Sequence, residues 1–234
     1  MDITQTITLA LIQGLTEFLP VSSSAHLVIL PKFLDWPDQG LAFDVILHFA
    51  TLCAIIFYYR SSLLSLTRDF YDSIVTRKTQ GESMLAWGII LGTIPVGIVG
   101  LLFRETIELN LRSYQIVAFA TIFFGLLLGL SDWLHRVLDK SREYIRGSDI
   151  LIVGCFQALA LIPGTSRSGI TITAALLIGL SRTLSIKYAF LLSIPVITLA
   201  TLLKTFDLVK DTSQIDWTLL FIGFVVALIT SYFT

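Results

Sequence analysis

Residues 84–103, MLAWGIILGTIPVGIVGLLF, contain no charged side chain and match the roughly 20 residues with which a helix crosses a bilayer. Residues 114–131 are also uncharged. Over the whole chain 55% of residues are hydrophobic and 14% are charged, whereas soluble domains carry about 25% charged residues. The sequence therefore predicts an all-α integral membrane protein. The net charge of −1 gives no basic field that would attract nucleic acid.

Two regions are apolar at both ends and polar in the middle. Residues 4–34 consist of two apolar runs, and residues 149–180 are divided in the same way by PGTSRSG at 163–169. Each apolar half would form a helix of about 18 Å, little more than half of the roughly 30 Å hydrocarbon core. This pattern predicts two re-entrant helical hairpins. Full spans are expected at about 41–59, 84–103, 114–132, 183–203 and 216–234.

The two hairpins and their following spans resemble an inverted repeat, about 1–132 and about 149–234. Loops 60–83 and 133–148 contain more Lys and Arg than loop 104–113, so we expect both on the cytoplasmic side. The first hairpin then enters from the outside and the second from the cytoplasm. When Pro20 is superposed on Pro163, Ser24 coincides with Arg167. Transporters with inverted repeats and interrupted helices bind substrate near the bilayer midplane.

Arg167 is the strongest functional signal, because a charge in the membrane core is costly and is retained for function. Its guanidinium matches the geometry of phosphate oxygens, and the half-helix that follows presents its free N–H groups. The neighbouring residues offer hydroxyl donors or a close backbone approach, so the loop suits an anion. A structural Arg paired with a buried carboxylate is the alternative. The neighbours concerned are Gly164, Thr165, Ser166, Ser168 and Gly169.

The first hairpin supplies a carboxylate, a serine cluster and a histidine. Gln13 and Glu17 are one helical turn apart, and Glu17 suits either a divalent cation or acid–base chemistry. An ion pair with Arg167 that only holds the hairpins together is the alternative. Ser23 and His26 have the spacing of a nucleophile and its base on a helix. A serine-rich helix cap, formed with Ser22 and Ser24, is favoured when these residues are considered alone.

Other ionisable or reactive side chains in the apolar stretches are interpreted more simply. Asp44 and His48 share a face of the first span, and polar packing against the site is expected in preference to direct chemistry. Lys187 is expected to extend towards the cytoplasmic interface. Cys53 and Cys155 are predicted to be small buried apolar residues, since their spacing matches neither a disulfide framework nor a metal site.

QGLTEFLPVSSSAH at 13–26 together with PGTSRSG resembles the bacterial undecaprenyl-diphosphate phosphatase family, also called the bacitracin-resistance family. The resemblance implies hydrolysis of undecaprenyl diphosphate to the monophosphate, with Mg²⁺ or Ca²⁺, so that the lipid carrier re-enters peptidoglycan synthesis. It assigns catalytic roles to Glu17, Ser23, His26 and Arg167, and metal binding to Gln13 and Glu17. The family normally continues for another helix, so we expect a sixth span to be missing here.

The remaining expectations concern substrate contacts, partners and location. The protein is expected in the bacterial inner membrane as a multi-pass protein, with its site open to the extracytoplasmic side. The expected partners are a polyprenyl diphosphate lipid and membrane lipids, and a second copy of the chain in a homodimer is possible. No nucleic acid is expected as a partner. Substrate contacts are expected from Gln13, Ser22, Ser24, Gly164, Thr165, Ser166, Ser168, Gly169 and Thr171.

Two other functions are compatible with parts of this pattern. A transporter or flippase for a lipid phosphate or another anion could use the same arginine to bind without cleaving. A lipid phosphatase with a histidine nucleophile is disfavoured, because no histidine follows His135. For hydrolysis, the sequence leaves open whether Ser23 or a metal-held water attacks, and we favour a direct role for Ser23.

Overall fold

The structure is a computed structural model that describes residues 1–111, 113–139, 141–209 and 216–234. In these ranges the regular structure is helical, apart from one isolated bridge between Arg142 and Leu180. The predicted all-α class is thus confirmed. Among the described helices, four are long and apolar enough to cross a membrane, and α11 (Trp217–Phe233) is apolar but shorter. The four are α3 (Leu41–Tyr58), α5 (Ser83–Leu102), α7 (Tyr114–Leu138) and α10 (Arg182–Val209).

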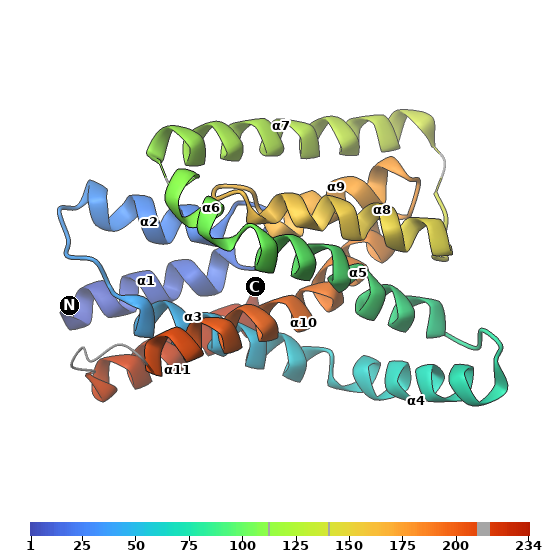
Figure 1. Ribbon diagram of the computed structural model, residues 1–234, viewed down its shortest axis with the longest axis horizontal. Coiled ribbons are helices and arrows are strands. Elements are labelled where there is room, and N and C mark those ends of the chain that lie inside the picture. The colour runs from blue at the N-terminus through green and yellow to red at the C-terminus, as the bar shows by residue number, and fades with distance from the viewer. Residues whose placement is uncertain (112, 140, 210–215) are drawn as a thin grey trace.

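Two pairs of short helices occupy the regions where re-entrant hairpins are predicted. In the first, α1 (Ile3–Thr16) is followed by α2 (Ser23–Phe33). In the second, α8 (Gly147–Ala158) and a 3₁₀ turn are followed by α9 (Arg167–Leu177). Figure 1 shows the two hairpins approaching each other from opposite ends of the molecule, with their turns in its interior. We call these turns, together with the first residues of the helices that follow them, the first tip (residues 17–23) and the second tip (residues 162–168).

The first helix of each hairpin packs against a helix of the other half of the chain. α1 lies against α11, α8 lies against α5, and α3 and α10 pack together between the halves. The α5–α8 contact is close enough that a Cβ added at Gly154 would lie 2.9 Å from the carbonyl oxygen of Gly92. Each half of the chain thus packs the first helix of its hairpin against the other half, as a two-fold relation between the halves would produce. The inverted repeat itself stays a prediction.

Two segments that are predicted to be loops because they contain charged residues instead contain helices. α4 (Arg60–Thr76) and the short α6 (Arg104–Asn110) lie in the predicted loops 60–83 and 104–113. In α4, Leu66 is buried in the main apolar cluster and Leu63 and Phe70 pack against it, which is the helical spacing of an amphipathic helix. The charged face of α4 concealed this pattern.

Three side chains singled out in the apolar stretches can be placed in the structure. Cys155 is exposed and Cys53 is half-buried, so the prediction that both are buried was wrong. Lys187 forms an ion pair with Glu82, at the loop that joins α4 and α5. Its extension towards the cytoplasmic interface stays a prediction.

The orientation in the membrane stays a prediction, and cysteine labelling can test it. Asp38 and Arg77 are both exposed, in the connections before α3 and before α5. In a Cys53→Ala/Cys155→Ala background, cysteines at these two positions should react with an impermeant maleimide from opposite sides of intact cells. Asp38→Cys should be labelled from outside and Arg77→Cys only after permeabilisation. Labelling of both from one side would contradict the assigned topology.

Candidate active site

The two tips meet at a buried ion pair between Glu17 and Arg167. Glu17 ends α1 and Arg167 begins α9, 150 positions later, and its Nη2 donates to Oε1 of Glu17. The Glu17 side chain has no exposed surface and that of Arg167 is 20% exposed. The structure thus contains the Glu17–Arg167 ion pair that the sequence analysis considered as an alternative. A buried charge left alone is strongly destabilising, so each member of the pair holds the other in place.

The second carboxylate oxygen of Glu17, Oε2, is surrounded by polar side chains from α1, α2 and α3. Oε2 accepts hydrogen bonds from Gln13 Nε2 at 2.9 Å and from Ser23 Oγ at 2.6 Å. The Nε2 atom of His48 lies 3.9 Å from the same oxygen. A serine hydroxyl donating to a carboxylate at this distance forms a strong charge-assisted hydrogen bond. Glu17 is therefore the centre of the site.

His26 does not lie where its predicted role as the base for Ser23 would place it. His26 Nδ1 donates to the carbonyl oxygen of Ser22 at 2.9 Å, and the His26 side chain is exposed. Its ring thus turns back over the first turn of α2, while the hydroxyl of Ser23 donates to Glu17. The structure does not show Ser23 and His26 as a nucleophile–base pair. In His48, Nδ1 donates to the Asp44 carbonyl at 2.8 Å, which leaves Nε2 facing Glu17.

His48 is the residue that sequence reasoning undervalued. Its spacing places it with Asp44 on one face of α3, but only the packing of α3 beside the first tip decides which face meets the site. The sole signal in the sequence was a histidine within an apolar span, a position that is often functional.

Hydroxyl groups of the second tip brace the loop and connect it to the first tip. Ser166 Oγ caps α9 by accepting from the Gly169 amide at 3.2 Å, and it lies 3.1 Å from Ser168 Oγ. Ser168 Oγ donates to the carbonyl oxygen of Leu19 in the first tip at 3.3 Å. Thr171 donates within α9, to the carbonyl oxygen of Arg167. These groups position Arg167 as well as offering oxygen atoms to a ligand.

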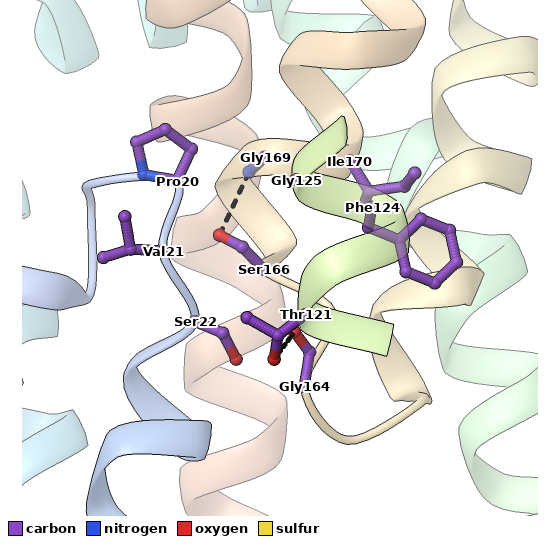
Figure 2. Close-up of a pocket in the computed structure, with 10 residues that line it drawn as sticks. All are labelled: Pro20, Val21, Ser22, Thr121, Phe124, Gly125, Gly164, Ser166, Gly169 and Ile170. Carbon is purple, nitrogen blue, oxygen red and sulfur yellow. Dashed lines mark hydrogen bonds between the residues drawn. The ribbon is translucent and has the colours of Figure 1, made fainter. Parts of the chain in front are cut away.

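A small polar pocket lies between the two tips and α7. Its cavity volume is only about 20 Å³, and Figure 2 shows Ser22 and Ser166 on the two tips with Thr121 of α7 beside Gly164. Thr121 Oγ1 lies 3.0 Å from the Gly164 carbonyl oxygen, to which it donates. Gly164 has φ of +94°, and a Cβ there would lie 2.3 Å from the Val117 carbonyl oxygen. Only glycine therefore lets the second tip rest on α7 in this way.

Two helices begin beside this pocket. α9 begins at Arg167, and α2 begins after Ser22, whose side chain makes no capping hydrogen bond and whose φ is 61°. Ser22 Oγ instead lies 3.3 Å from Ser24 Oγ. The N–H groups and the positive dipole end of a helix N-terminus favour an anion. The arrangement of the two starts and of Arg167 suits a ligand with phosphate groups.

The predicted divalent cation can be tested against the donor atoms present. Gln13 Oε1 is buried without a hydrogen-bond partner, and Glu17 supplies two carboxylate oxygens. Oxygen donors of this kind suit Mg²⁺ and Ca²⁺. The described residues contain no group of three or more His, Cys, Asp and Glu side chains that could hold a metal. Mg²⁺ commonly binds one or two carboxylates and completes its shell with water and substrate phosphate, so Gln13 and Glu17 fit such a shared site.

Comparison of the sequence with known proteins identifies the family of this chain. The model of the family described as bacitracin resistance protein BacA matches residues 6–234. The chain is 54% identical to an undecaprenyl-diphosphatase of Vesicomyosocius okutanii subsp. Calyptogena okutanii, over 100% of this chain and 89% of the relative. It is 56% identical to the undecaprenyl-diphosphatase of Ruthia magnifica subsp. Calyptogena magnifica, over 100% and 88%. With undecaprenyl-diphosphatase 2 of Stutzerimonas stutzeri it shares 53% identity, over 99% and 87%. The chain therefore belongs to the bacitracin resistance protein BacA family.

Proposed function

We infer that this membrane protein hydrolyses undecaprenyl diphosphate to undecaprenyl phosphate and phosphate, and so recycles the lipid carrier of peptidoglycan synthesis. The relatives that match nearly the whole chain carry the name of this enzyme. One structural observation supports the assignment most directly. The two tips bring the buried Glu17 into contact with both a hydroxyl nucleophile, Ser23, and a phosphate-binding group, Arg167.

Arg167 would bind the diphosphate by exchanging its partner. Without substrate its guanidinium is neutralised by Glu17. An arriving diphosphate offers more oxygen atoms in the fork geometry that a guanidinium prefers, and the starts of α2 and α9 add backbone N–H donors. Arg167 then stabilises the charge that grows on the phosphoryl oxygens during transfer. Glu17 is released from the ion pair for proton transfer.

Ser23 would attack the terminal phosphorus atom. Its hydroxyl donates to Glu17 Oε2 at 2.6 Å, so Glu17 is placed to accept the proton as the Oγ–P bond forms. The bond from this phosphorus to the bridging oxygen breaks, the electron pair stays on the oxygen, and undecaprenyl phosphate leaves. Water then attacks the phosphorus atom of the phosphoserine, the Oγ–P bond breaks, and Glu17 returns its proton to Ser23 Oγ. The phosphate leaves with the oxygen and the protons of the water. Direct attack by water activated at Glu17 is the competing path.

The proposal includes a divalent cation, Mg²⁺ or Ca²⁺, held by Glu17 and Gln13. When bound, such a cation would neutralise charge on the diphosphate. The unpartnered Gln13 Oε1 supports this assignment, because a buried polar atom without a partner is costly. The location in the bacterial inner membrane, the opening to the extracytoplasmic side and a homodimer are also proposals.

Phosphate release by purified protein in detergent tests this function. We expect release from undecaprenyl diphosphate without any intact membrane, loss of release on adding a chelator, and recovery with excess Mg²⁺ or Ca²⁺. Transport requires two separated compartments, so release in detergent also excludes a transporter as the sole function. Tight binding of the lipid with no phosphate release by folded, cation-loaded protein would contradict the hydrolase and favour the transporter.

A further inference from the structure

An apolar groove runs along α7 next to the polar pocket. Its cavity volume is about 350 Å³, and it is partly open at the surface. Ligand pockets of about 300–1,000 Å³ are large enough for a drug-sized molecule. We call this feature the α7 groove. It is lined by Ile116, Phe119, Ala120, Phe123 and Phe124 of α7 and by Ile162 of the second tip, with Gln115 at one end.

The α7 groove lies beside the polar pocket. Phe124 lines both cavities, and Figure 2 shows its ring turned away from the first tip. Ala120 of the groove is followed by Thr121 of the pocket, which donates to the Gly164 carbonyl of the second tip. The groove therefore lies next to the second tip along α7, where the apolar chain of a ligand bound at the tips would begin.

The chemistry of the groove is opposite to that of the pocket. Apart from Gln115, its lining side chains are apolar. The rings of Phe119 and Phe123 stack with centroids 5.9 Å apart, and their residues are 70% and 49% exposed. The groove extends over positions 115–124, which correspond to about 14 Å of helix. That length can hold the beginning of a long apolar chain but not all of it.

A prenyl diphosphate joins a highly charged head to an apolar chain, so it needs these two environments side by side. We propose that the α7 groove binds the first isoprene units of the polyprenyl chain while its diphosphate lies between the two tips, at Arg167 and the starts of α2 and α9. This inference rests on the proposed hydrolase function. It assigns Phe119 and Phe123 as residues that recognise the chain, and the rest of the chain lies among membrane lipids.

Truncation of the two phenylalanines tests the inference by kinetics. The substrate is farnesyl diphosphate, whose short chain keeps it soluble, and methyl diphosphate serves as the comparison without an isoprenoid chain. Phe119→Ala/Phe123→Ala should raise KM for farnesyl diphosphate at least about tenfold, as expected when a hydrophobic pocket loses matching contacts. The value of kcat should stay unchanged, because the groups at the phosphate are intact. Hydrolysis of methyl diphosphate should not respond to the substitution.

The same helix provides a matched control. Ile122 and Leu126 are 64% and 70% exposed on α7 but do not line the groove. Ile122→Ala/Leu126→Ala removes a similar amount of exposed apolar surface and should leave both kinetic constants unchanged. Equal effects of the two double variants, or an equal loss with methyl diphosphate, would overturn the α7 groove while hydrolysis itself remained established.

Photo-crosslinking gives a second result that does not depend on turnover. A farnesyl diphosphate carrying a diazirine on its first isoprene unit should label the peptide that contains residues 114–124, and undecaprenyl phosphate should compete. Label elsewhere, or label displaced only by bulk phospholipid, would overturn the assignment. If the wild type released no phosphate, the hydrolase proposal would fail by itself, whereas competed labelling of α7 would still support a polyprenyl site there.

Discussion

Ser23→Ala is expected to abolish phosphate release from undecaprenyl diphosphate while the protein stays folded. If Ser23 Oγ forms the bond to phosphorus, alanine has no atom to replace it. We expect turnover to fall at least about 10³-fold, still short of the roughly 10⁶-fold loss known for the nucleophile of a serine protease. Glu17 keeps its contacts with Gln13 and Arg167, so the fold loses one hydrogen bond. The measurement is phosphate release by monodisperse variant at saturating substrate.

A control and a trapping experiment separate the two paths of attack. Ser193 is also buried, and it donates to the Phe190 carbonyl oxygen within α10. Ser193→Ala should therefore remain active. In a single turnover with substrate labelled at the terminal phosphorus, wild-type protein should carry label on the peptide that contains Ser23. A measurable rate in Ser23→Ala, together with no labelled protein in the wild type, would show that water attacks directly.

The helical architecture could be predicted largely from charge and hydropathy. The charge-free stretches at 84–103 and 114–131 contain most of α5 and the first part of α7, because lipid demands apolar helices of a set length. Charge-based reasoning failed at α4. Its helix is amphipathic and packs one apolar stripe against the core, and such a stripe is easily overlooked among the charges of a polar segment.

The candidate site could be predicted where chemistry singled out a residue, and less well where packing decides. A carboxylate and a guanidinium in apolar surroundings need each other, so the meeting of Glu17 and Arg167 followed from the cost of isolated buried charge. The partner of Ser23 did not follow, since spacing along α2 suggested His26. The turn at Ser22 instead directs the Ser23 hydroxyl back to Glu17. No pattern within one helix contains that information.

Arg167→Lys is expected to lower turnover by about 10²–10³-fold or more, the usual cost of losing one preorganised charge-stabilising donor. The substitution keeps the positive charge. An ammonium group is compact and cannot make the planar, two-pronged contact with phosphate oxygens. It can still pair with Glu17, so the fold should survive. The alternative role of Arg167, as a counter-ion that only joins the two tips, would be fulfilled nearly as well by lysine.

Arg142→Lys is the matched control for this last prediction. Arg142 makes a two-pronged contact with Asp149, at 2.9 and 3.1 Å, in a part-buried pair that does not include the tips. If loss of an arginine–carboxylate pair merely loosens the fold, both lysine variants should lose stability and activity together. If Arg167 clamps the diphosphate, only Arg167→Lys should lose turnover, measured as phosphate release by folded, monodisperse protein at saturating substrate. A rate within about threefold of wild type, far from the typical penalty, would refute the clamp and leave Arg167 a structural partner of Glu17.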